Sequence, residues 1–184
     1  MLGEILENVR ERSPLIQNIT NYVTANDCAN ITLACGASPT MSDGEEEAEE
    51  MGRLCDGLNI NMGTLHPRSV KAMLLAGKSA AGFGRPIVLD PVGAGASTYR
   101  RETAEELLRE IPFTAIRGNI SEIKTISGGR SSSKGVDADA ADAVTEENLE
   151  KTIALARDFS GRTGAVIAIS GAVDIVTDTK NTYI

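Results

Sequence analysis

Short apolar segments with the composition of β-strands alternate with helical patterns about five times along the 184 residues of the chain. This alternation limits the possible folds more than any other feature, because parallel strands need a long crossover, usually a helix, between them. A mostly parallel sheet with helices on both faces meets that requirement. We therefore predict an α/β fold and a single domain over residues 1–184. The predicted strands cover residues 15–20, 37–41, 58–62, 87–90, 113–118 and 165–169, with one or two edge strands after residue 173.

Capping patterns indicate where several of the predicted helices begin. Ser42 and Glu45 have the spacing of a capping box, and Asn119 and Glu122 repeat it before a helix that ends near residue 128. The single histidine, His66, precedes a proline and is interpreted as a capping or exposed residue rather than a general base. The polar residues 130–145 predict a surface loop. Other helices are predicted over residues 1–12, 25–35, 66–79, 98–111 and 146–159.

The three cysteines, Cys28, Cys35 and Cys55, form neither a Cys-x-x-Cys pair nor a zinc-ligand spacing. A disulfide framework and a structural metal site are therefore not expected. Cys28 and Cys35 lie about two helical turns apart, which predicts that both are small buried residues on one face of a helix.

The formal charge of −8 argues against a nucleic acid or an anionic membrane as partner, because proteins bind both through clusters of Lys and Arg. No apolar run approaches the roughly 20 residues that span a bilayer. The first residues carry acids among the apolar positions, unlike a signal peptide. We expect a cytoplasmic protein with no membrane or nucleic-acid partner.

The carboxyl ends of the predicted strands carry the residues with the most evident chemistry, and ligands of open α/β sheets bind at such ends. Asp90 is followed by a glycine-rich turn whose N–H groups suit a phosphate, although the same pattern also serves tight turns without a ligand. Asp90 and Glu122 are oxygen ligands of the kind that Mg²⁺ prefers, and Arg117 can pair with phosphate oxygens. A helix cap also explains Glu122, and the two roles can coexist.

Five blocks of sequence resemble, in order, the signature blocks of hydroxyethylthiazole kinase, a thiamine-salvage enzyme of the ribokinase-like superfamily. The resemblance covers essentially the whole chain, and five blocks are far more specific than any one. Other alcohol kinases and the hydrate dehydratases of the superfamily match less well, and the third glycine of a Rossmann fingerprint is absent. The five blocks are Gln17–Val23, Gly36–Met41, Asn61–Leu65, Asp90–Ala96 and Arg117–Glu122.

The resemblance implies phosphorylation of the hydroxyl group of 4-methyl-5-(2-hydroxyethyl)thiazole, with ATP as co-substrate and Mg²⁺ as cofactor. It also implies a ribokinase-like fold and a homotrimer with active sites at the subunit interfaces. The residues carried over by motif position are Met41 and Asn21 for the substrate, Arg117 and Ser170 for ATP, and Asp90 and Glu122 for the metal and its phosphates.

One motif of the family has no counterpart in the sequence. Family members continue beyond the equivalent of Ile184 into a Gly-x-Gly-Cys helix start, which supplies the anion hole and the position of the catalytic base. We therefore assign no catalytic residue, and expect the C-terminal part of the fold to be missing and the phosphoryl transfer to be impaired. The alternative is a non-catalytic remnant of such a kinase that binds a ligand or oligomerises.

Overall fold

The structure is a computed structural model that describes residues 2–128 and 143–184. It divides into two compact units, Met1–Ile87 and Val88–Ile184, and each is described by itself. The organisation as a single domain stays a prediction. The predicted surface loop over residues 130–145 lies, up to residue 142, outside the described residues.

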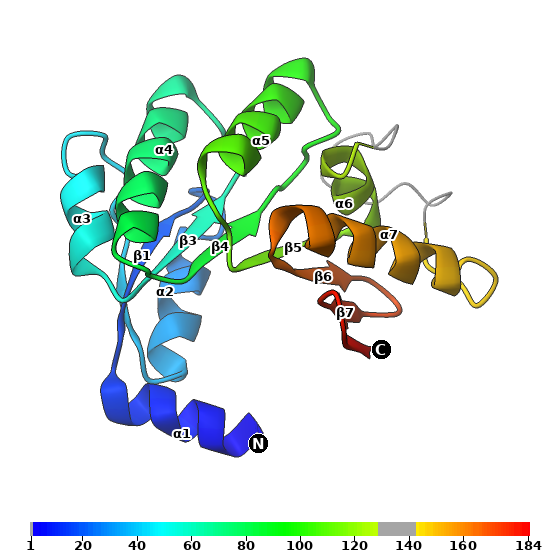
Figure 1. Cartoon of the computed structure of the whole chain (residues 1–184). Coiled ribbons are helices and arrows are strands. Elements are labelled where there is room, and N and C mark those ends of the chain that lie inside the picture. The colour runs from blue at the N-terminus through cyan, green and yellow to red at the C-terminus, as the bar shows by residue number, and fades with distance from the viewer. Residues whose placement is uncertain (1, 129–142) are drawn as a thin grey trace. The chain divides into compact units, whose positions relative to one another are not determined.

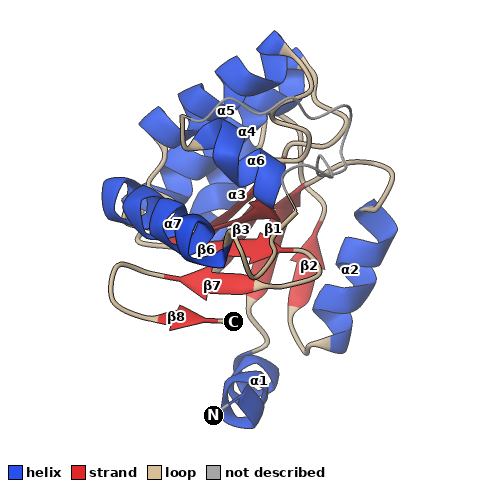
Figure 2. Ribbon diagram, turned by 90° about the vertical axis from the view of Figure 1, so that its right-hand side faces the viewer, coloured by secondary structure: helices blue, strands red, loops and turns tan. Residues whose placement is uncertain are grey.

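Three parallel strands form the sheet of the first unit, in the order β2-β1-β3 (Figure 2). They are β1 (Leu15–Ile19), β2 (Ser38–Thr40) and β3 (Gly57–Asn61). In β1 and β3, Asn18 lies beside Asn59 and Ile19 beside Ile60. This register brings the residues that follow the two strands to the same edge of the sheet, as the sequence predicts.

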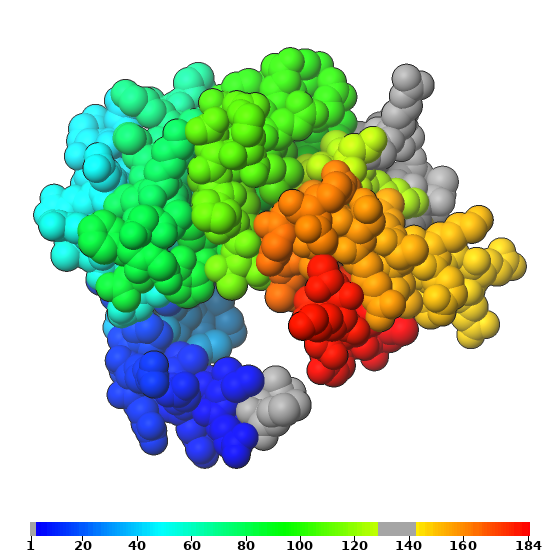
Figure 3. Space-filling view, in the orientation of Figure 1, coloured from blue at the N-terminus to red at the C-terminus, as the bar shows by residue number. Residues whose placement is uncertain are grey.

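Four helices accompany this sheet: α1 (Leu2–Arg12), α2 (Ala25–Ala34), α3 (Ala48–Leu54) and α4 (Pro67–Gly82). Helices α3 and α4 pack together on one face, while α2 lies on the other face (Figures 1 and 2). The prediction of helices on both faces is thus confirmed in this unit. Most of α1 is exposed to solvent (Figure 3).

The predicted capping box at Ser42 and Glu45 is wrong. Helix α3 begins only at Ala48, and its N-cap residue, Glu47, makes no side-chain capping bond. Instead, the Ser42 hydroxyl donates to Glu47 Oε1 at 2.6 Å, across a turn that includes Glu45. Several carboxylates follow Ser42 at similar spacing. The Ser42 hydroxyl bonds to Glu47, which lies two residues further along the chain than Glu45.

The prediction that Cys28 and Cys35 are buried is also wrong, because both are only half-buried. Cys35 is the C-cap residue of α2, and none of the residues of α2 is buried. Ile31 and Leu33 of this helix are 63% and 58% exposed. The helix therefore keeps apolar side chains in contact with solvent.

The sheet of the second unit has the strand order β4-β5-β6-β7-β8. Strands β4, β5 and β6 are parallel, whereas β7 and β8 are antiparallel to their neighbours and form the predicted edge. The parallel part of this sheet repeats the pattern of the first unit. The strands are β4 (Ile87–Asp90), β5 (Ala115–Asn119), β6 (Val166–Ser170), β7 (Ile175–Thr177) and β8 (Thr182–Tyr183).

Helices α5 (Thr98–Glu110), α6 (Ile120–Ile126) and α7 (Leu149–Thr163) belong to the second unit. The Ser97 side chain caps α5 by accepting the Arg100 N–H, and Gly164 ends α7 in the left-handed conformation that glycine adopts without strain. Within residues 2–128 and 143–184, no helix combines the length and the apolar character needed to cross a bilayer.

Candidate functional site

A cavity of about 130 Å³ lies at the carboxyl ends of β1 and β3 in the first unit. Its size suits a single small ring, since an apolar cavity of about 150 Å³ accommodates benzene. Among the described residues that line the cavity there is no Lys or Arg, so it offers no cation to a phosphate group. The lining includes Asn18, Asn21, Met41, Asn61, His66 and Met73.

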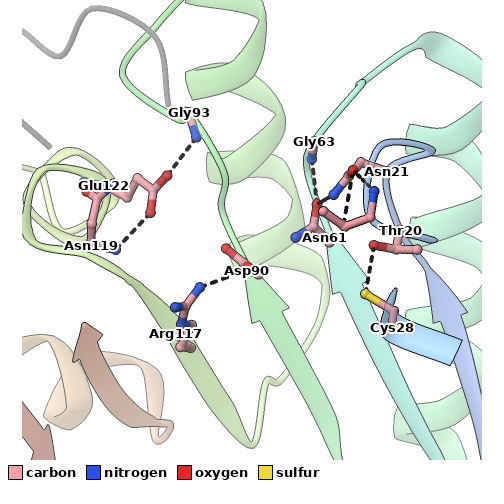
Figure 4. Close-up of polar contacts among 11 residues, drawn as sticks. Thr20, Asn21, Cys28, Asn61, Gly63, Asp90, Gly93, Arg117, Asn119 and Glu122 are labelled. Atoms are coloured by element: carbon pink, nitrogen blue, oxygen red, sulfur yellow. Dashed lines mark hydrogen bonds and ion pairs between the residues drawn. The ribbon is translucent and has the colours of Figure 1, made fainter. Parts of the chain in front are cut away.

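The two residues predicted for the substrate, Met41 and Asn21, both line this cavity. Met41 follows β2 and is 39% exposed, so it is accessible to a ligand in the cavity. Asn21 follows β1 and is only 9% exposed. Its carboxamide is bonded to neighbouring groups of the chain (Figure 4). The structure thus brings the predicted pair together, with Met41 the more open of the two.

His66 lines the same cavity, which the sequence interpretation did not foresee. Its expected role as a cap is confirmed, because His66 Nδ1 accepts the Ser69 N–H at 3.2 Å and Ser69 Oγ accepts the His66 N–H at 3.1 Å. The cap thereby fixes the orientation of the ring at the cavity.

In the second unit, Asp90 and Arg117 are brought together by the register of β4 and β5, in which Leu89 lies beside Ile116. Arg117 Nη1 lies 3.4 Å from Asp90 Oδ2 (Figure 4). The arginine side chain is 55% exposed and the aspartate side chain 19%. A long and partly exposed ion pair of this kind contributes little to stability, so the guanidinium can turn toward another anion at low cost.

Glu122 accepts backbone hydrogen bonds with both carboxylate oxygens. Oε1 accepts the Gly93 N–H at 2.9 Å, and Oε2 accepts the Asn119 N–H at 2.8 Å (Figure 4). The predicted capping box is confirmed, since Asn119 Oδ1 in turn accepts the Glu122 N–H at 2.9 Å. Gly118 leaves room for this side chain, because a Cβ there would lie 3.0 Å from Glu122 Oε2. Glu122 therefore connects the glycine-rich turn to the start of α6.

Burial is the main cause of the raised pKa of Glu122, which is 5% exposed. The hydrogen bonds from Gly93 and Asn119 act in the opposite direction, and the nearby Asp90 carboxylate raises the pKa further. The glycine-rich turn was predicted to present its N–H groups to a phosphate, but the Gly93 N–H donates to Glu122 instead. This contact joins residues 29 positions apart and has no sequence signature.

Ser170 is the last residue of β6 and lies beside Asn119 of β5. It is half-buried. Asp90, Asn119 and Ser170 therefore end three neighbouring parallel strands of the second unit. The predicted ATP residues, Arg117 and Ser170, share this sheet edge with the predicted metal ligands.

The carboxylates of the second unit suit a hydrated Mg²⁺ better than a fully enclosed metal. Among the described residues, no group of three or more His, Cys, Asp or Glu side chains could hold a metal ion. Mg²⁺ usually binds through one or two carboxylates and keeps several waters. Each Glu122 oxygen accepts one bond and retains a further lone pair that a metal-bound water can use. Asp90 is the more accessible of the two carboxylates.

Comparison with known proteins identifies the family of this chain. The model of the hydroxyethylthiazole kinase family matches residues 6–184. A hydroxyethylthiazole kinase of Clostridium acetobutylicum is 56% identical over 184 residues, which are 100% of this chain and 67% of that protein. The chain belongs to the hydroxyethylthiazole kinase family.

Solved structures place this family member in the ribokinase-like fold. The hydroxyethylthiazole kinase of Pyrococcus horikoshii superimposes with a TM-score of 0.83 at 40% identity, covering 97% of this chain and 64% of that one. A ribokinase II from Escherichia coli shares the fold alone, with a TM-score of 0.55 at 11% identity over 91% of this chain and 60% of that one. The chain thus spans about two thirds of the length of the kinases that it resembles.

Proposed function

We propose that this protein phosphorylates the hydroxyl group of 4-methyl-5-(2-hydroxyethyl)thiazole, with ATP as phosphoryl donor. The observation that carries the proposal is the cavity of about 130 Å³ at the ends of β1 and β3, in a chain of the hydroxyethylthiazole kinase family. A small neutral heterocycle fits a cavity of this size whose described lining holds no Lys or Arg. Met41 and Asn21 are the proposed substrate-side residues.

The second unit is the proposed site of ATP and Mg²⁺. Arg117 would pair with phosphate oxygens, and Ser170 would offer its hydroxyl from the neighbouring strand end. Asp90 and Glu122 would hold a hydrated Mg²⁺, which when bound neutralises the negative charge that develops on the transferred phosphate. Glu122 would act through water, since the two backbone N–H groups fix its carboxylate.

We further propose that the protein works in the cytoplasm, where ATP is abundant, and as a homotrimer with active sites at the subunit interfaces. The exposed apolar residues of α2 support association, because Ile31 and Leu33 stay in contact with solvent in the single chain. The net charge of −8 gives no support to a nucleic-acid partner.

Calorimetric titration with the thiazole alcohol tests the substrate assignment. We expect Met41→Ala to weaken binding about tenfold, because it removes an apolar side chain that lines the cavity. Met51→Ala is the matched control, since Met51 lies in α3 and is not part of the cavity. Equal affinity in all three proteins would overturn the placement of the substrate.

Titration with MgATP tests the second unit. Arg117→Ala should weaken MgATP binding about tenfold and leave the affinity for the alcohol unchanged. Arg109→Ala serves as control, because Arg109 pairs with the neighbouring Glu110 on the surface. Unaltered MgATP binding in Arg117→Ala would contradict the assignment.

A coupled assay for ADP release separates the kinase from the ligand-binding alternative. Release that depends on the thiazole alcohol supports the kinase. Binding of the alcohol without ADP release supports a non-catalytic ligand-binding module, and absence of binding at millimolar alcohol counts against both.

A further inference from the structure

The side chain of Asn21 lines the cavity, yet most of its hydrogen-bonding capacity is used within the chain. Asn21 Oδ1 accepts the N–H groups of Val23 and Thr24, both at 3.0 Å, and the Thr24 hydroxyl at 3.2 Å. These bonds close the turn that leads from β1 to α2. The carboxamide oxygen is therefore unavailable as the main acceptor for a ligand.

The carboxamide nitrogen of Asn21 reaches the loop that follows β3. Asn21 Nδ2 donates to Asn61 Oδ1 at 3.0 Å, and the same oxygen accepts the Gly63 N–H at 2.8 Å (Figure 4). The backbone donors on both sides fix the orientation of the two amides, since each must present its oxygen to an N–H group. One side-chain bond thus connects two loops of the cavity wall.

Gly63 shows how closely these two loops approach each other. A Cβ built on Gly63 would lie 2.4 Å from Asn21 Cβ and 2.8 Å from Asn21 Cγ, which is far inside ordinary contact. The loop after β3 can therefore rest on Asn21 only because position 63 has no side chain. The hydrogen bonds and this close approach are independent observations of the same junction.

We propose that Asn21 and Asn61 form an amide bracket that sets the shape of the cavity, so that Asn21 is a positioning residue for the alcohol. This inference rests on the proposed function, which supplies the ligand. The bracket holds the turn over residues 21–24 against the loop over residues 61–64, and both line the cavity. Asn21 thus affects binding through the backbone that it fixes.

Asn21→Asp tests the bracket with the smallest change in shape. The carboxylate still accepts the Val23 and Thr24 N–H groups, and a negative charge before the N-terminus of α2 is favourable there. It cannot donate to Asn61 Oδ1. The Asn61 oxygen then either stays close to the new carboxylate, which repels it, or the Asn61 amide rotates. Rotation moves its oxygen away from the Gly63 N–H.

Asn59→Asp is the matched control. Asn59 Nδ2 donates to Asn18 Oδ1 at 3.1 Å, so this change also removes an asparagine bond between β1 and β3. Asn59 itself does not line the cavity, whereas its partner Asn18 does, so this variant removes an asparagine bond at the cavity without touching Asn21, Asn61 or Gly63. Both variants are compared with the parent chain by titration with the thiazole alcohol and by amide hydrogen exchange at Gly63.

We expect Asn21→Asp to lower the affinity for the alcohol about tenfold and to speed Gly63 exchange at least about fivefold, whereas Asn59→Asp leaves Gly63 exchange unchanged and lowers the affinity less. Unchanged affinity and exchange in Asn21→Asp, or equal effects in both variants, would overturn the bracket. If the parent chain fails to bind the alcohol, the proposed function fails, and Gly63 exchange alone decides the bracket.

Gly63→Ala provides a second variant in case Asn21→Asp does not fold. It keeps every hydrogen-bonding group and pushes the two loops apart through the added methyl group. We expect a comparable loss of affinity, with a far-ultraviolet circular dichroism spectrum like that of the parent. Full affinity in a folded Gly63→Ala protein would contradict the proposed positioning.

Discussion

Glu122 combines a helix cap with a contact to a distant turn. Its burial disfavours the carboxylate, and two backbone hydrogen bonds offset part of that cost. Because the two bonds offset the cost of burial only in part, the pKa of Glu122 stays above its ordinary value. A side chain in this state is sensitive to pH in a way that an exposed glutamate is not.

The raised pKa predicts a pH-dependent stability difference between the parent chain and Glu122→Gln. A carboxyl group with a higher pKa in the folded state binds its proton more tightly there, so it contributes stability at low pH that is lost as the pH rises above the ordinary value of 4.5. The parent should therefore lose stability relative to Glu122→Gln as the pH is raised from 4.5 toward about 7.

Urea unfolding of both proteins across this range, in the presence of a chelator, measures that difference. The hydrogen bonds lost in Glu122→Gln change its free energy of unfolding by an amount that does not depend on pH. The change of the stability difference with pH therefore reports the pKa of Glu122. Parallel stability curves for the two proteins would contradict a raised pKa of Glu122.

Sequence reasoning predicted two residue roles that depend on near neighbours, although it failed for the box at Ser42 and Glu45. The Asn119–Glu122 box was predicted from its spacing, and His66 was interpreted as a capping or exposed residue from its place before a proline. The contact between Glu122 and Gly93, and the position of His66 in the cavity wall, depend on how strands are brought together. No local pattern encodes those contacts.

At the scale of elements, the start of α6 depends on its capping box. We expect Asn119→Ala to destabilise the second unit by about 1 kcal/mol, because it removes the acceptor of the Glu122 N–H. Asn119→Ser keeps a capping oxygen and should recover most of the loss. Thermal or urea unfolding measures both variants, and equal stability of Asn119→Ala and the parent would show that the cap contributes nothing.

The strands and most helices were predictable because their apolar periodicity and their end signals agree. The start of α3 was not, since the run of acids after Ser42 offers several carboxylates to one hydroxyl, and the bond forms with Glu47. Spacing alone cannot choose among identical side chains in a flexible turn. The helix therefore begins three residues later than Glu45.

At the scale of the whole molecule, burial of α2 could not be predicted from its sequence. The apolar residues of this helix look like core residues, but burial depends on what covers the helix. The grouping of residues at strand ends was predictable, because parallel strands in one sheet present their carboxyl ends to the same side. The assignments to the alcohol, ATP and Mg²⁺ stay predictions.

The exposed side chains of α2 predict self-association. We expect the parent chain to have the mass of a trimer in light scattering, and Ile31→Glu to shift it toward the monomer by placing a charge in an apolar contact. Phe83→Glu is the control, because Phe83 is 57% exposed and follows α4 instead. A monomeric parent, or an Ile31→Glu protein that stays trimeric, would contradict this interface.

The register of β5 has a consequence for insertions and deletions in this strand. Arg117 reaches Asp90 because Ala115 lies beside Val88, and Asn119 lies beside Ser170 in the same register. Adding or deleting a single residue within this strand would turn every later side chain to the opposite face of the sheet. The contact between Arg117 and Asp90 therefore depends on the length of β5.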